Sequence, residues 1–394
     1  METECPHGHP VAEGVATALP AQAALEEKGD GPERSPINLY NKRHIRRRNT
    51  MYLALQRRRR TLIPGLLGSL LLALGGVVHA AEVKPGPVNV TIAGYSSGGQ
   101  VTVFGEGVVD AVRRAYAGSS IIYEPGNPAG ALEHLRNSRR PFALESMIEP
   151  RMAYEGRAPF RAAYPEGSIT GVLNGAPDVF ALKVYARRAF LEEHGIKTFD
   201  DLIKKEVPMR VSINQPGNLW AREHVRALLA YYDKTMEDIE SWGGRLVPQP
   251  TGASNDLMRD GRLDVVITGG ATPSGAIVEL GSVQDIAFIP LSREHSDYVA
   301  KELGVQPGVI PANSYSFQSE ELHVPYTSFL IVAGPSASFD DAYKLAKAMY
   351  DQMERYRSLH PALAQASRER LADVGALPLH PGAQAFYREV GLIE

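Results

Sequence analysis

Residues 88–113 read VNVTIAGYSSGGQVTVFGEGVVDAVR, and this stretch decides the fold. Apolar side chains alternate at Val88, Val90 and Ile92, which predicts a β-strand, and they recur at helical spacing later in the stretch. Between the two patterns, the glycines and serines of residues 94–99 predict a tight loop. A loop that opens a helix aims backbone N–H groups at the positive end of that helix. The stretch therefore predicts half of a site for an anionic or acceptor-rich ligand.

The same order of patterns returns at residues 211–229, VSINQPGNLWAREHVRALL. A short apolar strand leads into a loop that contains Asn214 and Gly217, and apolar residues at helical spacing follow. Two strand–loop–helix units of one kind predict two lobes that face each other across a shared site.

Polar residues also follow the other predicted strands of the first part. A strand over residues 120–123 precedes Asn127, and a strand over residues 142–144 precedes Glu145 and Ser146. Open α/β sheets bind ligands beyond the carboxyl ends of their strands, so we expect these side chains at the same edge as the first loop.

Two further apolar stretches, FALKVYAR at residues 180–187 and SFLIVAG at residues 328–334, are typical of strands that cross between lobes. The two ends of the folded chain would then build one lobe around an inserted middle. The predicted division is lobe 1 at residues 88–187 and 325–394, and lobe 2 at residues 188–324.

The N-terminal region carries targeting signals rather than a folded domain. Residues 1–50 are rich in Gly, Pro, Ala and charge, and we interpret them as disordered or untranslated, with Met51 as a plausible start. Residues 51–80 combine four arginines, an apolar run and small residues, which predicts a secretory signal peptide cleaved near Ala80 and a periplasmic location. A membrane anchor is the alternative for the same run.

Composition limits the function classes. The chain has 394 residues and one cysteine, Cys5, so the folded part has no disulfide framework and no thiolate metal site. Residues 1–80 carry 11 lysines and arginines against 7 acidic residues, so the rest carries 31 against 38, a net charge of −7. This acidic body argues against a nucleic-acid partner. Metal-ligand spacings and phosphate-binding signatures are absent, so no cofactor is predicted.

One enzymatic alternative exists. Gly94, Ser96 and Gly98 fit the G-x-S-x-G pattern of a nucleophile elbow, and His360 or His380 could complete a secreted serine hydrolase. Only a short stretch precedes the first strand, however, and no earlier strand is left to supply an oxyanion loop. We therefore favour a protein that binds its ligand without catalysing a reaction.

Several short motifs resemble the TAXI family of solute-binding proteins, which feed TRAP transporters. The resemblance runs from residue 88 to the C-terminus and rests on SGG before a helix at 97–99, AYEG at 153–156, TFDDL at 198–202, DGRLD at 260–264 and LPLHPGA at 377–383. It implies a two-lobed α/β fold of the type II periplasmic-binding-protein kind, each lobe a central sheet flanked by helices, joined by two crossing strands. It also implies capture of a small organic acid or amino acid, such as glutamate or 2-oxoglutarate, for an integral membrane TRAP permease.

The candidate ligand-binding residues come from both lobes. Trp220 is predicted either to stack on a ligand or to pack its helix, and Lys183, Arg222 and Arg226 are possible partners of a carboxylate. Glu145 would instead meet an ammonium group, which favours an amino acid. The candidates are Ser96, Ser97, Gly98, Gln100, Asn127, Glu145 and Ser146 in the first lobe, and Asn214, Gly217, Asn218, Trp220, Gly270 and Thr272 in the second.

Overall fold

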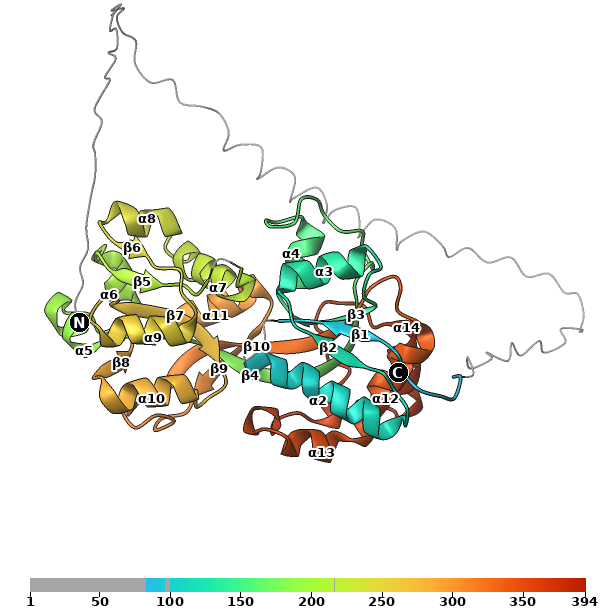
Figure 1. Ribbon diagram of the computed structural model, residues 1–394. Coiled ribbons are helices and arrows are strands. Elements are labelled where there is room, and N and C mark those ends of the chain that lie inside the picture. The colour runs from blue at the N-terminus through green and yellow to red at the C-terminus, as the bar shows by residue number, and fades with distance from the viewer. Residues whose placement is uncertain (1–82, 96–99, 216) are drawn as a thin grey trace, which may run out of the picture. The chain divides into compact units, whose positions relative to one another are not determined.

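The computed structural model describes residues 83–95, 100–215 and 217–394, and Figure 1 shows their arrangement. The predicted signal peptide and the loop residues Ser96, Ser97 and Gly98 lie outside the described residues. Among the helices that are described, none is long and apolar enough to span a bilayer.

All the described strands belong to one ten-stranded mixed sheet. Its order is β2-β1-β3-β10-β4-β7-β5-β6, with β8 paired to β4 and β9 paired to β10. The strands are β1 (Thr91–Ala93), β2 (Ile122–Glu124), β3 (Phe142–Ser146), β4 (Thr170–Arg187), β5 (Arg210–Ser212), β6 (Arg245–Leu246), β7 (Val265–Gly270), β8 (Ile286–Phe288), β9 (Gln306–Ile310) and β10 (Leu322–Ala333).

The long strands β4 and β10 divide the sheet into two lobes. In lobe 1, β1 pairs in parallel with β2 and β3, and β10 pairs antiparallel with β3 and with the first half of β4. In lobe 2, the second half of β4 pairs antiparallel with β7, and β5 pairs in parallel with β7 and β6. The structure thus confirms the predicted fold class, two α/β lobes joined by two crossing strands.

Both crossing strands are longer than the sequence pattern predicts. β4 begins at Thr170 rather than at Phe180, and β10 begins at Leu322 rather than at Ser328. Nearly every residue of β4 before Phe180 is buried, so the strand has no polar face and its sequence does not alternate. The predicted lobe boundaries fall at the end of β4 and inside β10.

Helices cover both faces of each half of the sheet. The described helices are α2 (Gln100–Ala115), α3 (Pro128–Arg136), α4 (Glu149–Glu155), α5 (Arg188–His194), α6 (Phe199–Lys204), α7 (Leu219–Ala230), α8 (Met236–Ser241), α9 (Thr251–Arg259), α10 (Gly275–Val283), α11 (Arg293–Leu303), α12 (Phe339–Asp351), α13 (Met353–Ser358) and α14 (Pro381–Glu389), with 3₁₀ turns at Pro361–Leu363 and Arg368–Arg370.

Because side chains alternate along each strand, each face of the sheet packs against its own hydrophobic core. In β3, Phe142 and Leu144 pack with α2 and α12, whereas Ala143 packs with α3 and α4 on the other side (Figure 1). In β7, Val265 and Ile267 face α7 and α11, whereas Val266 faces α9 and α10. The polar residues at the carboxyl ends of these strands therefore lie at the edge of the hydrophobic core.

Local sequence fixes several helix starts. Asn127 accepts a hydrogen bond from the N–H of Gly130 at 2.8 Å and so begins α3 just before Pro128. Thr198 and Asp201 form a reciprocal capping box at α6.

Candidate functional site

A cavity of about 420 Å³ lies between the two lobes. Lobe 1 contributes residues at the end of β1 and the start of α2, the crossing strand β4 contributes Phe180, and lobe 2 contributes the remainder. The lining residues are Tyr95, Gln100, Val101, Phe180, Asn214, Asn218, Trp220, Thr251, Thr268, Gly269, Ser274, Gly275 and Ala276.

Four helices begin at this cavity. Gln100 is the first described residue of α2, Asn218 is the N-cap of α7, Thr251 is the first residue of α9, and Ser274 is the N-cap of α10. Each helix carries a partial positive charge at its N-terminus, where the first N–H groups lack partners inside the helix. The four starts together make a positive environment for a ligand held among them.

Two of these helix starts have no side-chain cap. Asn218 caps α7 itself by accepting a hydrogen bond from Ala221 N–H at 3.0 Å. At α9 and α10, by contrast, the N-cap residues Pro250 and Ser274 make no side-chain cap hydrogen bond. Open space adjoins α10, because a Cβ placed on Gly275 would meet nothing within 4 Å. The starts of α9 and α10 are therefore not covered by a capping side chain, although the N–H of Ile277 in α10 already bonds to the Ser274 carbonyl at 3.1 Å.

Aromatic side chains line the cavity beside the crossing strands. The Trp220 indole Nε1 donates to Thr327 Oγ1 at 2.9 Å, and its ring meets the Phe180 ring edge to face with centroids 5.1 Å apart. A Cβ on Gly269 would lie 2.3 Å from the Trp220 ring, so only glycine fits there. Trp220 is 2% exposed, so its ring is packed inside the protein, and it also forms part of the cavity wall.

Hydroxyl and amide groups form a connected wall in lobe 2. The Asn214 side-chain amide donates to Thr251 Oγ1 at 3.3 Å, and the hydroxyls of Thr251 and Thr268 lie 2.8 Å apart. Asn214 has φ 67°, a left-handed conformation that asparagine tolerates better than most residues. This conformation turns the loop toward the start of α9.

A buried acidic pair lies behind Tyr95 in lobe 1. The Tyr95 hydroxyl donates to Glu149 Oε1 at 2.9 Å, and the Ser146 hydroxyl donates to Glu149 Oε2. Glu145 is fully buried, and neither of its carboxyl oxygens has a hydrogen-bond partner among the described residues. Burial, and then the neighbouring Glu149, raise the pKa of Glu145 well above its usual value. This burial favours the protonated, neutral form of Glu145 over its carboxylate.

The structure brings together some of the predicted site residues and separates others. Gln100, Asn214, Asn218 and Trp220 line the cavity. Gly270 is the last residue of β7, next to the lining residue Gly269, and Thr272 lies on the loop that follows, close to the lining residue Ser274. Asn127, Glu145, Ser146 and Gly217 do not line it, and Ser96, Ser97 and Gly98 lie outside the described residues.

Sequence reasoning missed the two uncapped helix starts. The sequence predicts that residues 256–259 continue a helix that Gly261 ends, but residues 251–255 are small or polar and show no helical spacing, so the pattern does not give the start of α9 at Thr251. It predicted no helix at α10. The available signal was the polar-rich start of each helix after a proline, Pro250-Thr251 and Pro273-Ser274.

The three basic residues considered for a carboxylate do not line the cavity. Lys183 is buried behind the loop after β7, where its Nζ donates to the carbonyl oxygens of Gly270 and Ala271 at 2.6 and 3.3 Å. Arg226 pairs with Glu223 at 3.0 Å. All the cavity-lining residues that the structure describes are uncharged, and the described chain holds no cluster of residues suited to a metal ion.

A second cavity, of about 450 Å³, lies between α4 and the helices α7 and α11. Its charges largely compensate one another, because several of its arginines contact its glutamates, partly within one lobe and partly between the lobes. These contacts are Arg151–Glu155 at 2.9 Å, Arg157–Glu223, Arg226–Glu302 at 3.2 Å and the bond from Arg151 to the Glu302 carbonyl at 2.9 Å. We interpret this region as a contact between lobes.

The structure does not support His360 or His380 as the partner of a catalytic serine. The His380 backbone N–H bonds to Gly171, at the amino end of β4, whereas Tyr95 follows the carboxyl end of β1. Because β4 and β3 both pair antiparallel with β10, β4 runs parallel to β3 and β1, and these two places lie at opposite ends of the sheet. His380 and His360 instead use Nδ1 to accept hydrogen bonds from the N–H groups of Gly382 and Ala362.

Comparison with solved structures gives distant likenesses. The periplasmic aliphatic sulphonate binding protein SsuA of Escherichia coli is 14% identical, with a TM-score of 0.40 over 78% of this chain and 84% of that chain. The malate-bound MatC protein of Rhodopseudomonas palustris is 15% identical, with a TM-score of 0.42 over 78% of this chain and 99% of that chain. A binding protein of a phosphonate transporter from Pseudomonas aeruginosa is 9% identical, with a TM-score of 0.42 over 69% and 78%.

A family model gives a direct assignment. The model of the NMT1-like family matches residues 92–391. That range begins in β1, ends just after α14 and contains every residue of the cavity wall. The chain belongs to the NMT1-like family.

Proposed function

We propose that this protein is a periplasmic solute-binding receptor that captures a small organic acid or amino acid and delivers it to a TRAP-type transporter in the membrane. The protein would bind its ligand without catalysing a reaction. The observation that carries the proposal is the convergence of four helix N-termini on one cavity between two lobes.

The chemistry of the wall favours an acid. Helix N-termini bind carboxylates and related anions through backbone N–H groups, without a charged side chain in contact. The lining supplies such ends together with amides and hydroxyls, and it presents no carboxylate that would repel the ligand. Trp220, Phe180 and Tyr95 add apolar surface for the carbon skeleton.

The two lobes provide a mechanism for capture. Ligand contacts come from both lobes, so a ligand binds the state in which the lobes are together more tightly than a state in which they are apart. The closed receptor would then be the form that the permease recognises, and release would follow reopening. Such a movement would change the backbone angles of the crossing strands β4 and β10, which connect the lobes.

Among the two ligand classes, the structure gives more support to an acid without an amino group. A carboxylate is the strongest partner for an ammonium group, and Glu145, whose pKa burial raises well above its usual value, lies outside the cavity wall. Glutamate and 2-oxoglutarate remain the ligands that the motif resemblance suggests, and a direct comparison of the two would decide between the classes.

Thermal-shift screening of the purified protein against carboxylates and amino acids tests the proposal. A true ligand raises the melting temperature, and the stabilisation grows with the logarithm of ligand concentration above the dissociation constant. Gly275→Leu is the matched variant, because the new side chain would occupy the open cavity at the start of α10. We expect this variant to keep its melting temperature and lose the shift. If no acid or amino acid stabilises the wild-type protein at millimolar concentration, the receptor proposal is wrong.

A further inference from the structure

Lys183 lies directly behind one wall of the cavity. It stands on β4 opposite Thr268 of β7, and Thr268 lines the cavity. Its side chain is 2% exposed, and its Nζ donates to the carbonyl oxygens of Gly270 at 2.6 Å, Ala271 at 3.3 Å and Ala181 at 3.4 Å. A fully buried lysine is rare unless it has a role that offsets the cost of burying its charge.

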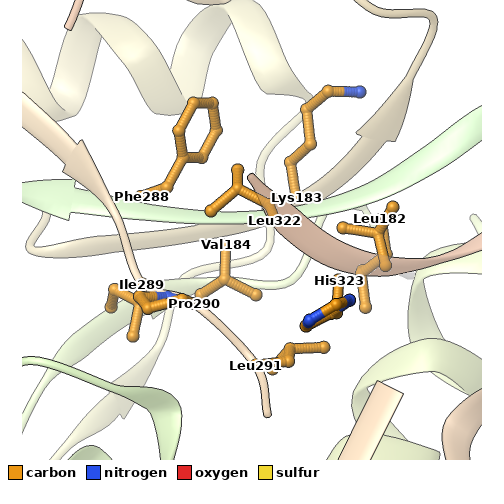
Figure 2. A pocket seen from close by; sticks show the side chains of 10 residues that line it. Leu182, Lys183, Val184, Phe288, Ile289, Pro290, Leu291, Leu322 and His323 are labelled. Atoms are coloured by element: carbon orange, nitrogen blue, oxygen red, sulfur yellow. The ribbon is translucent and has the colours of Figure 1, made fainter. Parts of the chain in front are cut away.

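The side chain extends toward the α9 and α10 face of β4. Figure 2 shows it extending away from His323 and Leu291, which line a small apolar pocket to which the stem of Lys183 also contributes. Its strand neighbours Leu182 and Val184 belong to the core on the opposite face. The ammonium group therefore faces the loop that carries Gly270 and Ala271, not solvent.

We propose that Lys183 supplies the counter-charge by which the cavity selects the more negatively charged of two ligands of similar shape. It acts through the peptide groups that it holds, without touching the ligand. This inference rests on the proposed function and names the residue responsible for the charge preference of that site.

The geometry of one peptide group links the charge to the cavity. The Gly270 carbonyl accepts from Lys183 Nζ, and the N–H of the same peptide, on Ala271, donates to Gln100 Oε1 at 3.1 Å. In a trans peptide the C=O and N–H groups point in opposite directions. The ammonium group draws electron density toward the carbonyl oxygen, so the N–H on the opposite side of the peptide, which faces Gln100, becomes more positive. Ser274 and Gly275, at the start of α10, follow on the same loop and line the cavity.

The surroundings leave this charge uncompensated among the described residues. Burial alone lowers the pKa of Lys183 to about 7, and no carboxylate acts on it. His323 on β10 lines the same small pocket but lies on the side away from the ammonium group (Figure 2). Three phenols also stand nearby: Tyr185 on β4, Tyr326 on β10 and Tyr315, which accepts from Ser274 N–H. Burial raises the pKa of each, so they are neutral near pH 7. An anion in the cavity would be the missing partner, and it would favour the protonated amine.

The experiment compares 2-oxoglutarate with 2-oxopentanoate, which has the same five-carbon chain but a methyl group in place of one carboxylate, and so one negative charge fewer. Dissociation constants are measured by calorimetry for the wild-type protein, Lys183→Met and Lys344→Met. Lys344 is the matched control, because it is also buried, 5% exposed, but stands on α12 in lobe 1 beside Tyr116. We expect wild type and Lys344→Met to prefer the diacid at least tenfold at pH 6, and Lys183→Met to lose that preference while still binding.

A second measurement needs no variant. If bound anion favours protonated Lys183, binding takes up about half a proton at pH 7, and affinity for 2-oxoglutarate falls about tenfold between pH 6 and pH 8.5. Calorimetry in two buffers of different ionisation enthalpy gives the proton uptake directly. Retained charge preference in Lys183→Met, or binding of the wild type without proton uptake, overturns the role of Lys183 and leaves the receptor function intact. Failure of both compounds to bind wild type overturns this inference together with the proposed ligand class.

Discussion

The side-chain oxygen of Gln100, at the start of α2 in lobe 1, accepts a hydrogen bond at 3.1 Å from the backbone N–H of Ala271 in lobe 2. This bond runs between the lobes beside the cavity, which Gln100 lines. Gly270 is part of the same contact, since a Cβ there would stand 3.1 Å from Gln100 Oε1. The bond thus joins the predicted glycine loop of lobe 1 to the loop that follows β7.

Gln100→Ala should weaken ligand binding more than it weakens the fold. The variant removes one bond between lobes, and a net hydrogen bond contributes about 0.5–1.5 kcal/mol, so we expect affinity for the acid found by screening to fall roughly 2- to 12-fold. Calorimetry measures the affinity, and urea unfolding measures the stability. Gln384→Ala on α14, remote from the cavity, is the control and should leave the affinity unchanged. Equal affinities for Gln100→Ala and wild type would contradict a role of this bond in capture.

Two buried histidines predict a loss of stability in acid. His224 is stacked on Trp220 with ring centroids 3.8 Å apart, and the Nε2–H of His295 donates to the Leu228 carbonyl at 3.0 Å. Burial lowers the pKa of His224 to about 3 and that of His295 to about 4, from an ordinary value of 6.5. Below pH 6.5 these two histidines are therefore protonated in the unfolded chain but remain neutral in the folded chain. The free energy of unfolding falls as pH falls.

Each histidine adds up to about 1.4 kcal/mol per pH unit to that slope between pH 6.5 and its folded pKa. Urea unfolding at several pH values from 7 to 4.5 checks this, with the slope rather than the absolute stability as the readout. His224→Gln and His295→Gln should each reduce the slope, even if they lower stability at pH 7. His194→Gln, at the end of α5, is the control and should keep the wild-type slope. Slopes that are identical in all four proteins would show that these rings titrate normally.

Sequence patterns predict the lobe-forming units because those units are local. The strand, loop and helix at residues 88–113 and 211–229 are set by alternation, glycine content and helical spacing within one short stretch, and the structure has β1 with α2 and β5 with α7 there. The same patterns identified Gln100, Asn214, Asn218 and Trp220, which line the cavity. Each is at or next to a loop that opens a helix.

The rest of the cavity depends on pairings between distant residues. Phe180 reaches the wall because β4 pairs with both β10 and β7, and Thr268 reaches it because β7 lies beside β5, more than 50 residues earlier in the chain. Lys183 looks from the sequence like an ordinary polar residue of an alternating strand. Only the pairing of β4 with β7 places its amine against the Gly270 carbonyl.

Gly269 provides a test of how tightly the aromatic wall is built. A Cβ at this position would lie 2.3 Å from the Trp220 ring and 2.4 Å from the Phe180 ring, and both rings are held by neighbours, Trp220 by its bond to Thr327 and Phe180 by Phe329. Since the rings cannot easily move aside, Gly269→Ala should destabilise the fold by about 1–3 kcal/mol, the usual cost of overpacking. Urea unfolding gives the value.

Gly252→Ala is the matched control for Gly269→Ala. Gly252 lies in the first turn of α9, where an added Cβ would meet nothing within 4 Å, so that variant should match or exceed wild-type stability because alanine favours helix by about 1 kcal/mol over glycine. A Gly269→Ala protein as stable as Gly252→Ala would mean that Trp220 moves freely. The indole would then be a ligand contact rather than a fixed part of the wall, and the bond from Trp220 to Thr327 would have to break when the ring moves.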